Sequence, residues 1–390
     1  EHLSGQHVSG MLPNEVIYDR LPATPKYLLH YQEQARGAFA SNITQPPTIV
    51  TATWHTAQRL PADERKDFLK HCFPVLQTYL GWLLAVRTDK TDGLPMLTHP
   101  HESGMDDNPV WESVLEREWA TDRLNLKESL VGFIGAKLLP SMRRKRGDYQ
   151  DDASPERANN RSVLLAYLQS ELAYRFNSDP HAILEHGKGT VVKDIGFNVL
   201  LADACRSMIN IEATVADDWY RIDSQLYEAM GRIEQGIENT HYDEHTGSYH
   251  SIDVRTGDYL PATTAASLLP LLTTRDSRRQ DTLVSEITNP ASYWTAVPIP
   301  SVRADSPQFT ASRYWRGGSW SFLRYQLERA LRQNGKDMLA SGLRARVMHN
   351  PSARSAGEFN NPHTGQALGA QPFSPAAAEL LLYTHINKQK

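Results

Sequence analysis

The chain has 390 residues, of which 40 % are hydrophobic and 22 % are charged, and its formal net charge is −4. This composition is typical of a globular protein with a large core, and the slightly acidic balance gives no reason to expect a nucleic-acid partner. No apolar run approaches the roughly 20 residues of a membrane-spanning helix, and the polar N-terminus lacks the pattern of a signal peptide. Length alone allows one large domain or two ordinary ones.

Hydrophobic periodicity predicts a mainly helical chain. In order along the sequence, the first clear apolar stripe repeats at spacings of three and four over residues 68–83, after a start signal at residues 61–63. Pro74 lies inside this stripe and is expected to kink or split the helix. Cys72 lies in the same stripe and Cys205 in another apolar helical pattern, so both are expected to be buried free thiols. Free thiols favour a reducing compartment, and we expect a cytoplasmic protein.

The rest of the chain gives a similar pattern. The polar residues 143–160 predict a surface loop, residues 219–237 carry a second apolar helical stripe, and residues 242–259 predict a turn-rich hairpin. Ser319 is expected to cap a helix that stops at residues 334–335. Ser374, followed by a proline, is expected to open the last helix.

Residues 99–111 read His-Pro-His-Glu-Ser-Gly-Met-Asp-Asp-Asn-Pro-Val-Trp and combine carboxylates, aromatic side chains, a glycine and two prolines. Such an acidic, irregular segment suits a sugar-cleaving site, in which one carboxylic acid protonates the leaving oxygen and a second carboxylate activates water. The alternative is a structural loop in which residues 107–109 begin a helix. Pro100 interrupts the spacing that His99, His101 and Glu102 would need to bind a metal on a helix, so we expect neither a metal nor a cofactor.

Two further segments change this balance. Residues 313–320 read Arg-Tyr-Trp-Arg-Gly-Gly-Ser-Trp, and residues 358–375 read Glu-Phe-Asn-Asn-Pro-His-Thr-Gly-Gln-Ala-Leu-Gly-Ala-Gln-Pro-Phe-Ser-Pro. With residues 99–111 and with Ile-Thr-Gln-Pro-Pro at 43–47, they resemble glycoside hydrolase family 63, the six-hairpin glycosidases. Within that family the pattern is most similar to bacterial mannosylglycerate and glucosylglycerate hydrolases. The four motifs occur in the family's order, and the resemblance extends over essentially the whole chain.

The resemblance implies an all-α fold, an (α/α)6 barrel in which loops at one end of six helical hairpins form the sugar pocket. It implies a single catalytic domain over residues 1–390. The chain starts at a point that resembles the inside of the family's barrel, and a Trp-Gly-Trp-Asp loop of the family is not found. We therefore expect an N-terminally incomplete barrel that lacks the first hairpin.

The resemblance also implies the chemistry. Asp106 matches the family's general acid and Glu358 its general base, which holds the attacking water. Because the family inverts, the two carboxyl groups are expected to lie roughly 6.5–9.5 Å apart, with room for a water between them. Asp107 and Glu102 are candidates for the negative charge that would keep the acid protonated. The expected partner is a small carbohydrate; the oligomeric state is open.

Further residues match ligand contacts of the family or lie beside its catalytic acid. Trp315 is expected to be the most exposed aromatic ring of its motif, and Arg143 with Tyr149 matches a pair that grips a glycerate carboxylate. Arg144 and Arg146 remain alternatives to Arg143. The substrate-contacting residues expected on these grounds are Gln45, His101, Glu102, Gly104, Asp107, Arg143, Tyr149, Tyr314, Trp315 and Trp320.

Departures from the family pattern leave two alternatives to this enzyme. His101 stands where the family has a tryptophan, Gly318 stands where it has a proline and is expected to loosen that loop, and Asn360 replaces a phenylalanine. The first alternative is a trehalase- or glucoamylase-like enzyme on the same fold. The second is a degenerate homologue that binds carbohydrate without cleaving it, against which the presence of both Asp106 and Glu358 argues.

Overall fold

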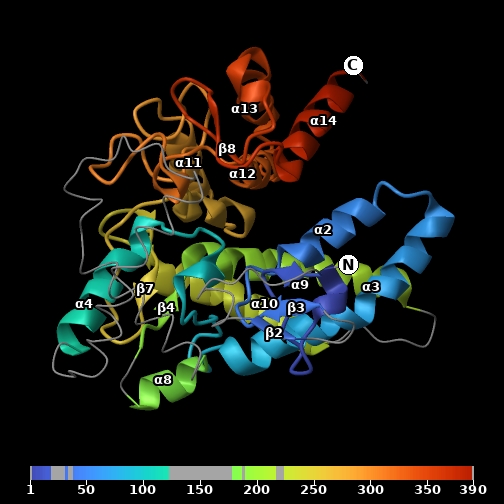
Figure 1. The fold of residues 1–390 in the computed structure, drawn as a ribbon, viewed down its shortest axis with the longest axis vertical. Helices are drawn as coiled ribbons and strands as arrows, with labels where there is room; N and C mark the ends of the chain where they lie inside the picture. Colours follow the sequence, from blue (N-terminus) through green and yellow to red (C-terminus); the bar gives the residue numbers. More distant parts are fainter. Residues whose placement is uncertain are drawn as a thin grey trace. The chain divides into compact units, whose positions relative to one another are not determined.

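A computed structural model of the protein describes residues 2–18, 31–33, 38–122, 178–186, 189–216 and 224–388. The chain forms two compact units: unit 1 comprises residues 1–105, 170–242 and 251–259, and unit 2 comprises residues 106–169, 243–250 and 260–390. Helices dominate both units, whereas the described strands are two or three residues long (Figure 1). The all-α class expected from the sequence is therefore confirmed. Within the described ranges, no helix is both long and apolar enough to cross a bilayer.

Unit 1 is organised around the helix α9 (Ile195–Val215). Its most extensive contacts are with the helices α2 (Thr48–Ala57), α3 (Ala62–Trp82) and α10 (Ser224–Gly236) (Figure 1). Most residues of α9 are buried on every side of the helix. A helix that is buried on all its faces lies inside a protein rather than at its surface, and α9 is accordingly the centre of this unit's core.

The first predicted helix begins where expected, directly after Pro61, but Pro74 neither ends nor splits it. Pro74 and Lys70 are both exposed, so the hydrogen bond that proline cannot make is lost on the solvent side of the helix. Cys72 and Cys205 are buried free thiols, as predicted. Burial raises the pKa of Cys205 to about 12.

Short segments complete unit 1. The strands β1 (Val16–Ile17), β3 (Phe39–Ser41) and β2 (Tyr31–Glu33) form an antiparallel sheet in that order, and β4 (Val192–Lys193) pairs antiparallel with β7 (Ile252–Asp253). The hairpin predicted over residues 242–259 is therefore only partly correct, because β7 pairs with β4. The other elements are η1 (His2–Gly5), the π-helical η3 (Leu83–Arg87) and η6 (Ile237–His241), η4 (Pro100–Ser103) and α8 (Pro180–His186).

Unit 2 is organised around α12 (Ser321–Gln333), which contacts α13 (Asp337–His349), α14 (Ser374–Lys388) and η7 (Ala265–Leu272) (Figure 1). The predicted ends hold: α12 stops before Asn334, and α14 starts at Ser374. The further elements are η5 (Pro109–Trp111), α4 (Glu112–Asp122), β6 (Ser248–Tyr249), α11 (Ser277–Ile287), η8 (Tyr314–Arg316), η9 (Ser352–Arg354), β8 (Phe359–Asn360) and β9 (Ala367–Leu368). The boundary between the two units in the sequence falls within β5 (Tyr242–Asp243).

Ser319 does not cap α12, so this prediction is wrong. The residue before the helix is Trp320, which makes no side-chain cap. The Ser319 hydroxyl instead donates to the carbonyl oxygen of Pro298, and its backbone exchanges hydrogen bonds of 2.8 and 2.9 Å with Asn360. Ser319 thereby joins the segment before α12 to the segment around β8.

Asp194 gives unit 1 a pH-dependent stability. It caps α9 by accepting a hydrogen bond from the amide of Phe197 (2.9 Å), and burial raises the pKa of its carboxyl from 3.8 to about 6. The folded state therefore holds this proton to a higher pH than the unfolded state. Its contribution to the free energy of unfolding is full below pH 4, falls as the pH rises towards 6, and changes by roughly 3 kcal/mol in total.

Asp194→Asn should remove this dependence, because asparagine keeps the capping oxygen and cannot ionise. Urea denaturation of both proteins at pH 4.5 and pH 7.5 measures it. We expect the variant to gain stability relative to the wild type at pH 7.5. An equal pH dependence in the two proteins would contradict the prediction.

Candidate active site

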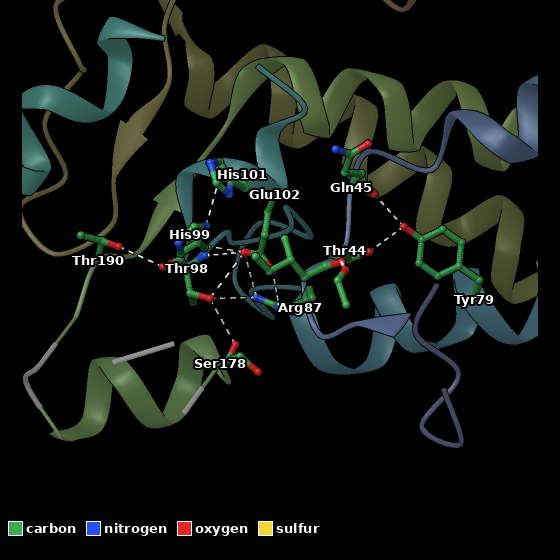
Figure 2. A network of polar contacts seen from close by, with 12 residues as sticks. Thr44, Gln45, Tyr79, Arg87, Thr98, His99, His101, Glu102, Ser178 and Thr190 are labelled. Carbon is green, nitrogen blue, oxygen red and sulfur yellow. Dashed lines mark hydrogen bonds and ion pairs between the residues drawn. The ribbon is translucent and has the colours of Figure 1, made fainter. Parts of the chain in front are cut away.

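The first acidic residue of the 99–111 segment, Glu102, lies in unit 1 and is fully buried. Its carboxylate pairs with Arg87, with a Nη2–Oε1 distance of 2.5 Å, and accepts hydrogen bonds from the amides of Thr98 (2.8 Å) and His99 (3.3 Å) (Figure 2). His99 in turn accepts from the amide of His101, so that residues 99 and 102 form a capping box around η4. The contacts of Glu102 thus stabilise its own loop. The negative charge that was expected to keep the general acid protonated is instead neutralised by Arg87.

Gln45, His101 and Gly104 also lie in unit 1. Gly104 ends η4 with φ of +73°, and a Cβ there would lie 3.2 Å from Pro46 Cδ, so the loop approaches the residue after Gln45 closely. The Tyr79 hydroxyl donates to the Gln45 carbonyl oxygen (2.6 Å; Figure 2). The structure therefore brings two of the predicted motifs together, and the roles of these residues as ligand contacts remain predictions.

The chain enters unit 2 at Asp106, which is half-buried. Its neighbour Asp107 has φ of +62° and accepts two hydrogen bonds from the Arg313 guanidinium, at 3.0 and 3.1 Å. Arg316 Nε lies 3.4 Å from the same carboxylate, and Arg316 Nη1 lies 2.6 Å from Glu112 Oε1. Asp107, predicted as a source of free negative charge, is thus paired with two cations.

Asn108 then caps η5, because its side-chain oxygen accepts from the amide of Val110 (2.9 Å). The structural alternative for residues 107–109 is correct, because the segment starts a helix; the catalytic interpretation of the segment remains a prediction. The same residues can serve both purposes, since the cap uses Asn108 and leaves the Asp106 carboxyl to other partners.

Glu358 is held at both carboxylate oxygens. Tyr314 donates its hydroxyl to Oε1 (2.9 Å), and the backbone amide of Ala370 donates to Oε2 (3.0 Å). The Glu358 amide in turn donates to the Ala370 carbonyl oxygen (3.0 Å). Gly369, with φ of +72°, makes this contact possible, because a Cβ there would lie 2.5 Å from Glu358 Oε2. The carboxylate therefore has a fixed direction, and each oxygen retains a lone pair for a further donor such as water.

Aromatic rings pack beside Glu358. Trp315 and Trp320 stack in parallel with centroids 3.8 Å apart, Trp320 stacks on Phe359 at 5.2 Å, and Tyr314 meets Trp320 edge-on at 4.8 Å. Both tryptophans are 5 % exposed, whereas Tyr314 is half-buried. The expectation that Trp315 is the most exposed ring is wrong: two rings stacked face to face shield each other, and Tyr314 is the accessible member.

The two glycines of this motif let neighbouring segments pack closely against the loop, whereas the loosening expected from the missing proline remains a prediction. A Cβ on Gly318 would lie 2.4 Å from the Phe359 ring, and a Cβ on Gly317 would lie 2.4 Å from the Thr310 carbonyl oxygen. The loop is further fixed by hydrogen bonds of 2.9 Å in both directions with Ser301. Glycine is needed here because neighbouring atoms occupy the space of a side chain.

Some predicted features fall elsewhere. Arg143, Tyr149 and the alternatives Arg144 and Arg146 lie outside the described residues, as does the whole predicted surface loop. Conversely, periodicity and composition did not point to Arg313 and Arg316, although both stand in a motif already singled out. The sequence did contain a hint. Arg313 and Arg316 flank the two aromatic residues of that motif, and Asp107 is a second carboxylate directly after the proposed acid.

Taken by itself, unit 2 holds two acidic segments that contact one short segment. Arg313 and Arg316 contact Asp107, and Tyr314, which lies between them, contacts Glu358. A carboxylate fixed by two donors beside aromatic rings suits the deprotonation of a bound water next to an apolar sugar face. A sequence model of the mannosylglycerate hydrolase MGH1-like glycoside hydrolase domain matches residues 2–374.

The chain belongs to this family of glycoside hydrolases.

Curated members of the family cover nearly the whole chain. The mannosylglycerate hydrolase of Thermus thermophilus is 29 % identical over 382 residues, which cover 97 % of this chain and 86 % of that protein. The glucosylglycerate hydrolase of Mycolicibacterium hassiacum is 25 % identical over 402 residues, which cover 97 % of this chain and 84 % of that protein. The predicted resemblance to glycoside hydrolase family 63 is confirmed, and this MGH1-like chain is a hydrolase of glycosidic bonds.

A solved structure gives the same result. The crystal structure of the family 63 mannosylglycerate hydrolase from Thermus thermophilus in complex with Tris and D-glycerate matches with a TM-score of 0.77 and 27 % identity. The match covers 98 % of this MGH1-like chain and 86 % of that one.

Proposed function

We propose that the protein is an inverting α-glycosidase that hydrolyses a small α-glycoside of glycerate, either glucosylglycerate or mannosylglycerate. Membership of the MGH1-like family and relatives that act on these two compounds support the substrate class. The observation that carries the proposed chemistry is the Glu358 carboxylate, which two donors hold in one direction beside a group of aromatic rings.

In the proposed reaction, Asp106 donates a proton to the glycosidic oxygen as its bond to the anomeric carbon breaks. Glu358 takes a proton from a water that attacks the opposite face of that carbon. The products are glycerate and a sugar of inverted configuration. The hydroxyl of Tyr314 and the amide of Ala370 keep the base aligned with the water.

The proposed binding site uses the loops at one end of an (α/α)6 barrel. Tyr314 is the aromatic ring of the motif that is accessible to a sugar, while the stacked tryptophans support it. Arg143 and Tyr149 are the proposed grip on the glycerate carboxylate, since a guanidinium binds a carboxylate through two parallel hydrogen bonds. Gln45 and His101 complete the proposed contacts.

The stereochemistry of the product tests the mechanism. A water activated by Glu358 attacks once and in line, so an α-glycoside should release the β-sugar first. Proton NMR of the fresh product from glucosylglycerate or mannosylglycerate, recorded before mutarotation, distinguishes the anomers. An initial α-anomer would contradict the proposed roles. Faster hydrolysis of trehalose than of glucosylglycerate and mannosylglycerate would favour a trehalase-like enzyme. Absence of hydrolysis of all three compounds would favour a carbohydrate-binding protein.

Tyr314→Phe tests the alignment of the base. Losing the hydroxyl leaves Glu358 with one fixed donor, and we expect kcat to fall about tenfold because misorientation outweighs any gain in basicity. Tyr293→Phe is a matched control: this tyrosine is buried in unit 2, and its hydroxyl has no hydrogen-bond partner among the described residues. Steady-state kinetics of both variants decides the point, and equal kcat values would contradict the prediction.

A further inference from the structure

The charged cluster next to Asp106 is balanced and largely enclosed. Two guanidinium groups, Arg313 and Arg316, contact two carboxylates, Asp107 and Glu112. The side chains of Arg316 and Arg313 are only 6 % and 16 % exposed. Because the charges cancel and the shortest contacts are charge-assisted hydrogen bonds, the cluster has no positive charge to spare for an anionic ligand. Its contacts act within the protein, and we call these four residues the arginine clamp.

One member of the clamp, Asp107, has a strained backbone. Asp107 has φ of +62°, in the left-handed region that is unfavourable for most residues other than glycine. A conformation of this kind costs of order 1–3 kcal/mol and persists only when the surroundings fix it. The two hydrogen bonds from Arg313, together with the contact of Arg316, supply that fixation on the side chain of Asp107 itself.

The clamp also fixes the chain that follows Asp106. Asp107 is held by two arginines, Asn108 caps η5, and Glu112 at the start of α4 is held by Arg316 and by Gln308 Nε2 (3.3 Å). Asp106 shares a peptide plane with Asp107, so the φ angle of Asp107 sets how that plane, and the Cα of Asp106 with it, is oriented relative to the chain that follows. A shift at Asp107 would move the Asp106 carboxyl directly.

We propose that Arg313 and Arg316 are positioning residues for the general acid, which act on Asp106 through their ion pair with Asp107. The proposal rests on the proposed function, in which Asp106 is the acid. Loss of the clamp should slow the step that requires proton donation and should leave substrate binding and the action of Glu358 unchanged.

Asp107→Gly separates the clamp from the backbone conformation. Glycine adopts positive φ without strain but offers nothing to the two arginines. If only the backbone conformation mattered, this variant would be at least as active as the wild type. We expect instead that kcat on the glycosylglycerate falls about 10- to 100-fold, with KM changed less than about twofold. Asp107→Asn, which tolerates the conformation and keeps one acceptor, should give an intermediate loss.

Asp305→Asn is the matched control. Asp305 also accepts two hydrogen bonds from an arginine of unit 2, Arg303, both at 2.9 Å, but it belongs to no proposed part of the site. This variant should keep the wild-type kcat. Thermal unfolding of all variants shows whether each is folded under assay conditions.

The decisive readout compares two leaving groups on the same sugar. Glycerate leaves as an alkoxide that needs a proton, whereas fluoride leaves without one, so a misplaced acid harms hydrolysis of the glycosylglycerate far more than that of the α-glycosyl fluoride. Asp107→Gly and Asp107→Asn should retain activity on the fluoride within about threefold. Asp106→Asn should show the same selectivity with a larger loss, and Glu358→Gln should lose activity on both substrates.

The outcomes are distinct. Selective loss in both Asp106→Asn and Asp107→Gly supports the proposal. The positioning role is overturned if Asp106→Asn shows the selective loss but Asp107→Gly does not. In that case Asp107→Gly has wild-type activity or loses activity equally on both substrates, and the proposed function stays intact. Absence of selectivity in Asp106→Asn would overturn the assignment of the acid and the proposal with it.

Discussion

Glu358→Gln is expected to lower kcat by about 10²–10⁴-fold while leaving the fold and the binding of sugar nearly intact. Glutamine has the same shape but cannot take a proton from water. Its amide oxygen can still accept from the Ala370 amide, and its NH2 group can donate to the Tyr314 hydroxyl, which then acts as the acceptor. Both contacts that orient the side chain therefore survive the substitution, and only the base is lost.

Asp106→Asn should cause a loss of similar size on the glycosylglycerate, because the amide cannot protonate the leaving oxygen. Steady-state kinetics gives kcat for both variants, calorimetric titration with the substrate measures binding, and circular dichroism checks the fold. A variant that kept the wild-type kcat would show that the corresponding role belongs to another residue.

The largest expected effect on stability is at Arg324, which is 1 % exposed. Its guanidinium pairs with Glu379 of α14 through contacts of 2.8 and 2.5 Å and donates to Ser319 Oγ (2.9 Å) and Asn360 Oδ1 (3.3 Å). Arg324→Met leaves a buried carboxylate without its cation and should lower the free energy of unfolding by about 3–5 kcal/mol. Urea denaturation measures this change.

Two further variants test the cause. Replacing both partners, as in Arg324→Met with Glu379→Leu, removes the uncompensated charge and should recover most of the loss. Arg303→Met in the same unit removes an arginine that is one-third exposed, so we expect a loss of less than about 1 kcal/mol. A double variant as unstable as Arg324→Met would show that the hydrogen bonds to Ser319 and Asn360 matter more than the ion pair.

Features that depend on neighbouring residues could be predicted from the sequence. The start of α3 after Pro61, the end of α12 before Asn334 and the start of α14 at Ser374 follow from local backbone preferences. The place of Asp106 and Glu358 in irregular segments also followed, because prolines and glycines interrupt the helical pattern around both.

Features that depend on contacts between distant segments could not. Arg313 and Asp107 are 206 positions apart, and neither periodicity nor composition states which of many arginines meets which carboxylate. The same limit applies to the exposure of Trp315, since the stacking of a second ring against it is a property of the folded loop. A serine near a helix start, such as Ser319, has the sequence pattern of a cap even where its hydroxyl binds a distant carbonyl, so this pattern cannot distinguish the two cases.

Of the two hydrogen bonds that orient Glu358, one comes from a side chain and the other from the main chain. This difference matters for the evolution or engineering of a new activity. Tyr314 contributes a side chain, so a single codon change can weaken, remove or replace its hydrogen bond. Ala370 contributes a main-chain amide that every residue except proline possesses, and Gly369 admits no side chain beside the carboxylate. Random mutagenesis can therefore tune one anchor gradually, whereas the other persists unchanged until the turn that carries it is rebuilt.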